Sequence, residues 1–209
     1  INETNKHHSN GRHEYMISKS ALEADVFLSV PKLKTHKKVG ITLNLKSLVG
    51  INGNKNWLPH YSIGSPENKG DQFPSRSPLR SLENSLVLHA KKALIRETPI
   101  VKSMAGWLRP AAYGIFGQTS KVVRSGNWHG NDTCWRMCLD LNRILLYANA
   151  DGSFRDKPKR YFSIVDGVIG MEGDGPVAGW PKEAGLVAAG HDPVAVDAVC
   201  AAWVGFDYR

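Results

Sequence analysis

The sequence predicts an α/β protein with a mainly parallel sheet flanked by helices. Short apolar runs of strand length occur at residues 26–30, 161–165 and 184–189. Amphipathic helical patterns stand between and after these runs, and the strands alternate with the helices along the chain. Such alternation is typical of a layered α/β fold, so we expect the three strands to lie in one sheet.

Three helices are expected, because apolar residues recur there at helical spacing. They cover residues 79–96, 132–148 and 193–204. Asp132 is the expected N-cap of the second, and Asp192-Pro193 begin the third, which Gly205 ends. Residues 39–49 fit a strand by the alternation in their first half and a helix by Leu48 and Val49, so both alternatives stay open.

The length of 209 residues suits a single domain. Because the chain starts with Ile1 and stops where a new element should begin, we expect a fragment truncated at both ends, with residues 1–20 as a connecting segment. No apolar run of about 18 residues predicts a membrane span, and no signal sequence opens the chain. Three cysteines are too few for a secreted disulfide framework, which favours the cytoplasm.

A net charge of +8 favours an anionic partner. Lys32, Lys34, Lys37 and Lys38 lie in one short stretch together with His36, directly after the first predicted strand. Ligands of open α/β sheets bind at the carboxyl ends of strands, so this stretch is a candidate anion site. A solvated basic turn is the alternative.

Three residues of this region are candidates for chemistry. His36 titrates near neutral pH and is a candidate acid/base, while Lys34 is a candidate ligand for an anionic cofactor or substrate. Lys46 has apolar neighbours, and burial would favour a neutral amine that acts as a nucleophile or a cofactor tether; a lysine whose head reaches water is the alternative. His60 is a candidate metal ligand, in competition with an ordinary exposed histidine.

A second candidate site is a glycine-rich acidic loop expected at residues 166–179, after the second strand. Its glycines would let backbone N–H groups approach a cofactor, and its carboxylates could hold a hard metal or move a proton. The candidates are Asp166 as a catalytic residue, Gly173 and Gly175 as cofactor-binding residues, and Glu172 and Asp174 as metal ligands. We expect His36 and Lys46 to share a cleft with this loop at its wall, and a tight structural turn is the alternative.

Other signals exclude function classes. Pro176 interrupts the only pattern that approaches a dinucleotide-binding fingerprint, and no phosphate-binding G-K-[ST] motif is present. Cys134 and Cys138 share a helix face but are too few for a structural zinc or an iron–sulfur cluster, so we expect core thiols. Asp197, inside an apolar helix, needs a hydrogen-bonded or basic partner.

Several strings resemble the domain of unknown function 362 family over roughly residues 22–206. They are Ala24-Asp25-Val26, Pro31-Lys32-Leu33-Lys34-Thr35-His36, Leu45-Lys46-Ser47-Leu48-Val49-Gly50, Gly170-Met171-Glu172-Gly173-Asp174-Gly175-Pro176 and His191-Asp192-Pro193-Val194-Ala195-Val196-Asp197. The resemblance implies no established activity. Members sometimes carry a ferredoxin-like iron–sulfur module, and the cysteine spacing of that module is absent here, so any such cluster would lie outside this chain.

A more distant similarity is to nickel-dependent lactate racemase, in which a histidine, a cofactor-tethering lysine and a metal-ligand histidine follow a strand. His36, Lys46 and His60 occur in that order with similar gaps. The similarity implies proton transfer by His36, a covalent tether at Lys46 and metal ligation by His60. This chain departs from that pattern in having Asn44-Leu45 where a glycine pair is expected.

Two functions of different class follow. The first is an enzyme domain that acts on a small anionic substrate, a carboxylate or a phosphate, as a metal- or cofactor-dependent isomerase or oxidoreductase. The cofactor stays open between a divalent metal and a nickel-type organic cofactor, and the oligomeric state is open too. The second is a polyanion-binding module for nucleic acid or acidic polysaccharide. No aromatic residues interleave with the lysines of residues 32–38, so nucleic acid is not the expected partner.

Overall fold

The computed structural model describes residues 2–78, 82, 85–86, 123 and 125–208. The chain divides into two compact units, one formed by Ile1–Tyr61 with Asn131–Arg209 and the other by Ser62–Gly130. Each unit is described on its own. The helix predicted over residues 79–96 falls almost entirely outside the described residues.

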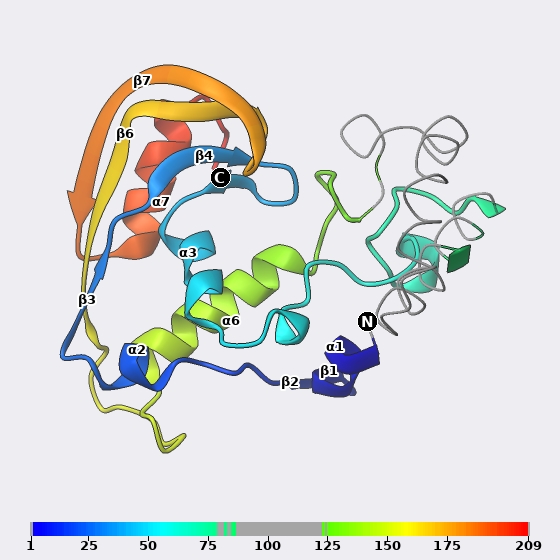
Figure 1. Cartoon of the computed structure of the whole chain (residues 1–209), viewed down its shortest axis with the longest axis horizontal. Helices are drawn as coiled ribbons and strands as arrows, with labels where there is room; N and C mark the ends of the chain where they lie inside the picture. The colour runs from blue at the N-terminus through cyan, green and yellow to red at the C-terminus, as the bar shows by residue number, and fades with distance from the viewer. Residues whose placement is uncertain (1, 79–81, 83–84, 87–122, 124, 209) are drawn as a thin grey trace, which may run out of the picture. The chain divides into compact units, whose positions relative to one another are not determined.

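The first unit contains a mixed sheet of five strands, which confirms the α/β fold class (Figure 1). Its strands are β3 (Val26–Ser29), β4 (Lys32–His36), β5 (Gly40–Thr42), β6 (Arg160–Asp174) and β7 (Ala178–Gly190). Strands β3 and β4 pair with β6 in parallel, whereas β5 pairs with β4 and β7 with β6 in antiparallel orientation. The three predicted strands therefore lie in one sheet, and the third of them runs opposite to the other two.

Strands β3 and β4 follow one another along β6. Leu28 lies opposite Phe162, and Lys32 lies opposite Asp166. Pro31 separates the two strands because it has no N–H group to continue the ladder, although its carbonyl accepts a hydrogen bond from Asp166 N at 3.0 Å. The chain thus stays beside β6, and β4 brings His36 close to the far end of that strand.

The segment predicted as a loop is a long β-hairpin, so the loop prediction is wrong for most of residues 166–179. Strand β6 continues to Asp174 and β7 begins at Ala178, with a register shift between Gly167 and Ile169. Close packing explains the glycines: a Cβ atom on Gly175 would lie 2.0 Å from the carbonyl oxygen of Thr35. Figure 1 shows the two strands of this hairpin bent around α7.

Helix α7 (Pro193–Trp203) begins and ends as predicted. The Asp192 carboxylate accepts hydrogen bonds from Val194 N at 2.8 Å and Ala195 N at 3.2 Å, which satisfies two free N–H groups of the first turn. Gly205 follows the helix with a φ of 87°, a conformation that favours glycine.

Helix α6 (Cys134–Tyr147) is present, but its predicted N-cap is wrong. Thr133 occupies the cap position, and Asn131 Oδ1 accepts the hydrogen bond of Cys134 N at 2.8 Å. Asp132 instead pairs with Arg136, one turn further along, at 3.1 Å. Asparagine and aspartate have similar capping preferences, so the local sequence did not separate the two residues.

Residues 39–49 contain both of the elements that the pattern left open. Strand β5 covers Gly40–Thr42, helix α3 covers Asn44–Ser47, and the 3₁₀ helix η1 covers Leu48–Ile51. The alternation and the helical spacing each described one half of the segment correctly.

Two clusters of buried side chains form the core of the first unit. One contains Leu48, Leu58, Cys134, Met137, Cys138, Leu141, Leu145 and Tyr161. The other contains Leu33, Leu43, Val165, Val196 and Cys200. The prediction of core thiols at Cys134 and Cys138 is confirmed, since both are buried.

The N-terminal segment, predicted as a connection, contains short elements that pack on the unit. They are α1 (Asn2–His7), β1 (His8–Ser9) and β2 (Arg12–His13), followed by α2 (Lys19–Glu23). The His7 ring stacks on Trp57, which ends the 3₁₀ helix η2 (Lys55–Trp57), with 3.5 Å between ring centroids. Tyr15 donates a hydrogen bond to Asp140 of α6 at 2.8 Å.

In the second unit, the described residues include the 3₁₀ helix η3 (Pro66–Asn68). Asp71 organises the surrounding loop: its carboxylate accepts from Ser62 N at 2.6 Å, and its carbonyl oxygen accepts from Trp128 Nε1 at 2.8 Å. Across the described residues of both units, no helix combines the length and apolar character needed to cross a membrane.

Candidate active site

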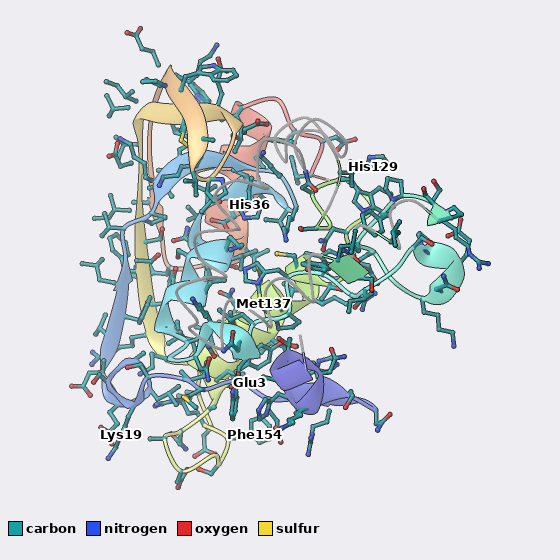
Figure 2. The ribbon with its side chains drawn as sticks, turned by 45° about the vertical axis from the view of Figure 1, so that its right-hand side comes forward. Glu3, Lys19, His36, His129, Met137 and Phe154 are labelled. Atoms are coloured by element: carbon teal, nitrogen blue, oxygen red, sulfur yellow. The ribbon has the colours of Figure 1, made fainter. Side chains whose placement is uncertain are left out.

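His36 is the last residue of β4 and is buried, with 8% of its surface exposed. Figure 2 labels it at the end of that strand. Its Nδ1 atom accepts a hydrogen bond from the backbone N–H of Lys38 at 3.1 Å. A backbone N–H can only donate, so the neutral ring carries its proton on Nε2. His36 is therefore a hydrogen-bond donor at Nε2.

His60 has the opposite tautomer. Its Nδ1 atom is 3.0 Å from the carbonyl oxygen of Leu58, which can only accept, so Nδ1 carries the proton and Nε2 keeps its lone pair. The carbonyl group of His60 accepts a hydrogen bond from Asn131 Nδ2 at 3.0 Å, which holds the backbone at this position. His60 is therefore an acceptor at Nε2.

The charge of Lys46 acts on both histidines. Burial lowers the pKa of His36 to about 3, with further lowering by the positive charge of Lys46 and by His60 and Lys38. Burial also lowers the pKa of His60 to about 4; its hydrogen bond to Leu58 opposes this effect, and the charges of Lys46 and Lys38 add to it. The charge of Lys46 thus acts on both histidines, and both are neutral at pH 7.

Three nitrogen atoms of this group have no hydrogen-bond partner in the part of the chain that the structure describes: Nε2 of His36, Nε2 of His60 and Nζ of Lys46. Within the same part, the fully buried side-chain atoms that lack a partner are Thr42 Oγ1 and Asn142 Oδ1. The three nitrogen atoms are therefore not fully buried. Together they offer a proton donor, a proton acceptor and a cation.

A buried network of hydrogen bonds holds the start of α3, the helix that contains Lys46. Asp197 of α7 accepts hydrogen bonds from the backbone N–H of Asn44 at 3.0 Å, from its Nδ2 at 2.9 Å and from Leu45 N at 2.9 Å. Asn44 Oδ1 in turn accepts from Tyr161 Oη at 3.0 Å and Ser163 Oγ at 2.7 Å. Burial raises the pKa of Asp197, and these hydrogen bonds oppose the rise. The partner predicted for Asp197 is thereby identified.

Sequence reasoning missed Asn44, although it is fully buried. The available signal was an amide residue between Leu43 and Leu45, both apolar, in a segment expected to be an element of the core. A polar side chain in such a place needs hydrogen-bond partners, as Asp197 does.

Asp166 does not join this group. Its carboxylate pairs with Lys32 at 2.8 Å, and this hydrogen bond holds the pKa of Asp166 below its usual value. Lys32 is the first residue of β4 and His36 the last, so about 13 Å of strand separates them. Lys34 lies between these ends, opposite Thr42 of β5.

The tip of the hairpin does lie beside the end of β4. Thr35 Oγ1 donates to the carbonyl oxygen of Gly173 at 2.9 Å, and Lys37 N donates to that of Gly175 at 3.4 Å. The glycines allow this approach. The part of the predicted loop around Gly173 and Gly175 is therefore next to His36.

The carboxylates of the hairpin are engaged in ion pairs. Asp174 pairs with Lys37 at 3.4 Å, while Glu172 pairs with Lys182 at 3.4 Å and accepts from Trp180 Nε1 at 3.1 Å. In the described residues no three His, Cys, Asp or Glu side chains come together as a metal site. The structure does not assemble the metal ligands predicted at His60, Glu172 and Asp174.

Fold and site together define an α/β protein with a lysine–histidine cluster at the end of a strand. The chain belongs to the family described as domain of unknown function (DUF362), whose model matches residues 2–202. The resemblance in its sequence strings is confirmed. No curated protein and no solved structure matches the chain. The similarity to lactate racemase is not shown.

Proposed function

We propose that the protein is an enzyme that acts on a small anionic substrate, a carboxylate or a phosphate, at His36, Lys46 and His60. Lys46 binds the anion, His36 donates a hydrogen bond to it from Nε2, and His60 accepts a proton from the substrate at Nε2. The observation that carries this proposal is the pair of neutral histidines with opposite tautomers next to a lysine that lacks a partner in the described residues.

The physical argument is that such an arrangement is costly without a ligand. His36 is buried and His60 is partly buried, so water can replace only part of the hydrogen bonds that their Nε2 atoms lack. A carboxylate or phosphate would accept from Lys46 and from His36 in charge-assisted hydrogen bonds. A donor and an acceptor of fixed tautomer also suit proton transfer on such a substrate.

The reaction class is that of an isomerase or an oxidoreductase. In an isomerase, His60 Nε2 takes a proton from one atom of the substrate and returns it to another, whereas an oxidoreductase would also need a bound cofactor to take up or supply the electrons. His60 is the candidate ligand if a divalent metal or a nickel-type organic cofactor takes part, because its Nε2 lone pair is available.

The alternative of a polyanion-binding module receives less support. Lys32 and Lys37 form ion pairs with carboxylates of the hairpin, and the Lys38 ammonium lies 4.9 Å from the centre of the Tyr61 ring. Most charges of the predicted basic stretch thus have partners within the chain. We place the protein in the cytoplasm, as expected from its three cysteines, all of which are buried.

The test is a calorimetric titration of the whole chain with inorganic phosphate and, separately, with acetate. Lys46→Met should weaken binding of the preferred anion by about tenfold or more, which corresponds to about 1.4 kcal/mol. Lys37→Ala is the matched control and should bind as the wild type does, since its ammonium is paired with Asp174. Equal binding by wild type and Lys46→Met would refute the proposed site.

A third variant separates charge from amine chemistry. Lys46→Arg keeps the positive charge but is never a neutral amine, so it should retain anion binding and lose any covalent tether. Intact mass after borohydride treatment in the presence of a small aldehyde reports on the tether.

A further inference from the structure

Helix α3, which carries Lys46, is too short to hold its own conformation. It covers four residues, Asn44–Ser47, and a helix of this length has almost no internal hydrogen bonds. The position of Lys46 must therefore depend on contacts from other elements.

Those contacts meet at Leu45, the residue before Lys46. The N–H group of Leu45 donates to Asp197 Oδ2 of α7 at 2.9 Å, and its carbonyl oxygen accepts from Asn142 Nδ2 of α6 at 3.1 Å. Both backbone groups of one residue are thus bound by buried side chains from two different helices. Asp197 also accepts hydrogen bonds from the backbone N–H and from the side-chain amide of Asn44.

The hydrogen bonds of Asn142 leave one of its own polar atoms unpaired, which is unfavourable for stability. Its Nδ2 donates to Leu45 and, at 2.8 Å, to the carbonyl oxygen of Cys138, while its Oδ1 is buried and lacks a partner in the described residues. A leucine here would suit the apolar stripe of α6 formed by Leu141 and Leu145. An amide that leaves a buried acceptor unpaired is unfavourable for stability alone.

We propose that Asp197 and Asn142 are positioning residues that place Lys46 beside His36 and His60. The inference rests on the proposed function, in which Lys46 binds an anion. Neither residue touches the substrate. Asp197 orders the start of α3, Asn142 orders the carbonyl group that precedes Lys46, and the two together restrict the ammonium to the neighbourhood of the two histidines.

The experiment compares variants of the whole chain by two measurements, phosphate affinity and the rate at which trinitrobenzenesulfonate modifies Lys46 relative to the exposed Lys19. Asp197→Asn keeps the volume but turns an N–H donor towards Leu45 N. We expect phosphate binding about tenfold weaker. Lys46 should react several-fold faster, because a loosened α3 exposes it.

Asp192→Ala is the control for stability. It removes another carboxylate that caps a helix, on the same α7 but away from α3. It should lower the melting temperature and leave both measurements as in the wild type. If Asp197→Asn behaves as Asp192→Ala does, Asp197 has only a structural role and the proposal is overturned.

Asn142→Leu keeps the proposal testable should Asp197→Asn fail to fold. It removes the buried unpaired acceptor together with the bond to Leu45, so the protein should stay folded while phosphate binding weakens and Lys46 reacts faster. Unchanged values would remove Asn142 from the proposal. If the wild type binds neither phosphate nor acetate, the proposed function fails, whereas the reactivity of Lys46 still decides whether the two residues position it.

Discussion

Acidification should destabilise the first unit through the two buried histidines of the candidate site. The pKa values of His36 and His60 in the folded state are about 3 and about 4, below the ordinary value of 6.5. Between these values the unfolded chain binds more protons than the folded one, so the free energy of unfolding rises with pH. The contribution of the two neutral histidines to the free energy of unfolding is fully present above pH 6.5. It is lost as the pH falls from 6.5 to about 4 for His60 and to about 3 for His36.

The magnitude follows from the size of the shift. Each group changes the free energy of unfolding by about 1.4 kcal/mol per pH unit within its window. From pH 7 to pH 5 this amounts to about 2 kcal/mol for each histidine, and to about 4 kcal/mol for both. Since the side chains are not completely sealed from water, these figures are upper bounds.

The variant that isolates one contribution is His36→Asn. Asparagine Oδ1 can still accept the hydrogen bond from Lys38 N, but the residue does not titrate. Urea unfolding at pH 7, 6 and 5, followed by circular dichroism, should show a loss on acidification that is smaller than in the wild type by up to about 2 kcal/mol. His129→Asn makes the same substitution at an exposed histidine of the second unit and controls for the change itself.

The reasoning is refuted if His36→Asn and the wild type lose the same free energy of unfolding between pH 7 and pH 5. That result would mean that His36 is hydrated in the folded protein, contrary to its burial. The argument for a neutral donor at His36 Nε2 would then fail as well.

Two further predictions concern the elements that frame the site. Gly175→Ala should lower the free energy of unfolding by about 2 kcal/mol, because its Cβ atom would lie 2.0 Å from the carbonyl oxygen of Thr35 and force the hairpin away from β4. Gly50→Ala is the control, since no atom lies within 4 Å of the position of its Cβ atom. In urea unfolding this control should change the free energy of unfolding by no more than about 0.5 kcal/mol. Asp192→Ala should lower it by about 1 kcal/mol through loss of the helix cap, and a melting temperature equal to that of the wild type would contradict the cap.

The sequence was sufficient to predict an element where interactions between neighbouring residues determine its limits. The start of α7 at Asp192-Pro193 and its end before Gly205 follow from capping and backbone preferences that involve only neighbouring residues. Strands β3, β6 and β7 were predicted from short apolar runs, whereas β4 was not. The apolar run of β3 was expected to be buried, but Val26 and Leu28 are exposed.

The prediction of secondary structure failed where contacts with distant segments of the chain determine it. Residues 166–174 have the composition of a loop, yet they form a strand because they pair with β7 on one side and lie beside β4 on the other. Glycine disfavours a strand by its flexibility, but here it allows the close approach of Thr35. Pairing with other strands outweighed the local preference.

The sequence by itself determined the residue types of the candidate site and placed His36 shortly after a strand, whereas in the structure His36 ends a further strand, β4. Only the tertiary structure decided which of these residues meet. Asp166 lies at the other end of β4 because the parallel register pairs it with Lys32. Asp197, 152 residues away from Leu45, binds the start of the helix that contains Lys46. Contacts over such separations depend on the packing of whole elements, and no local pattern encodes them.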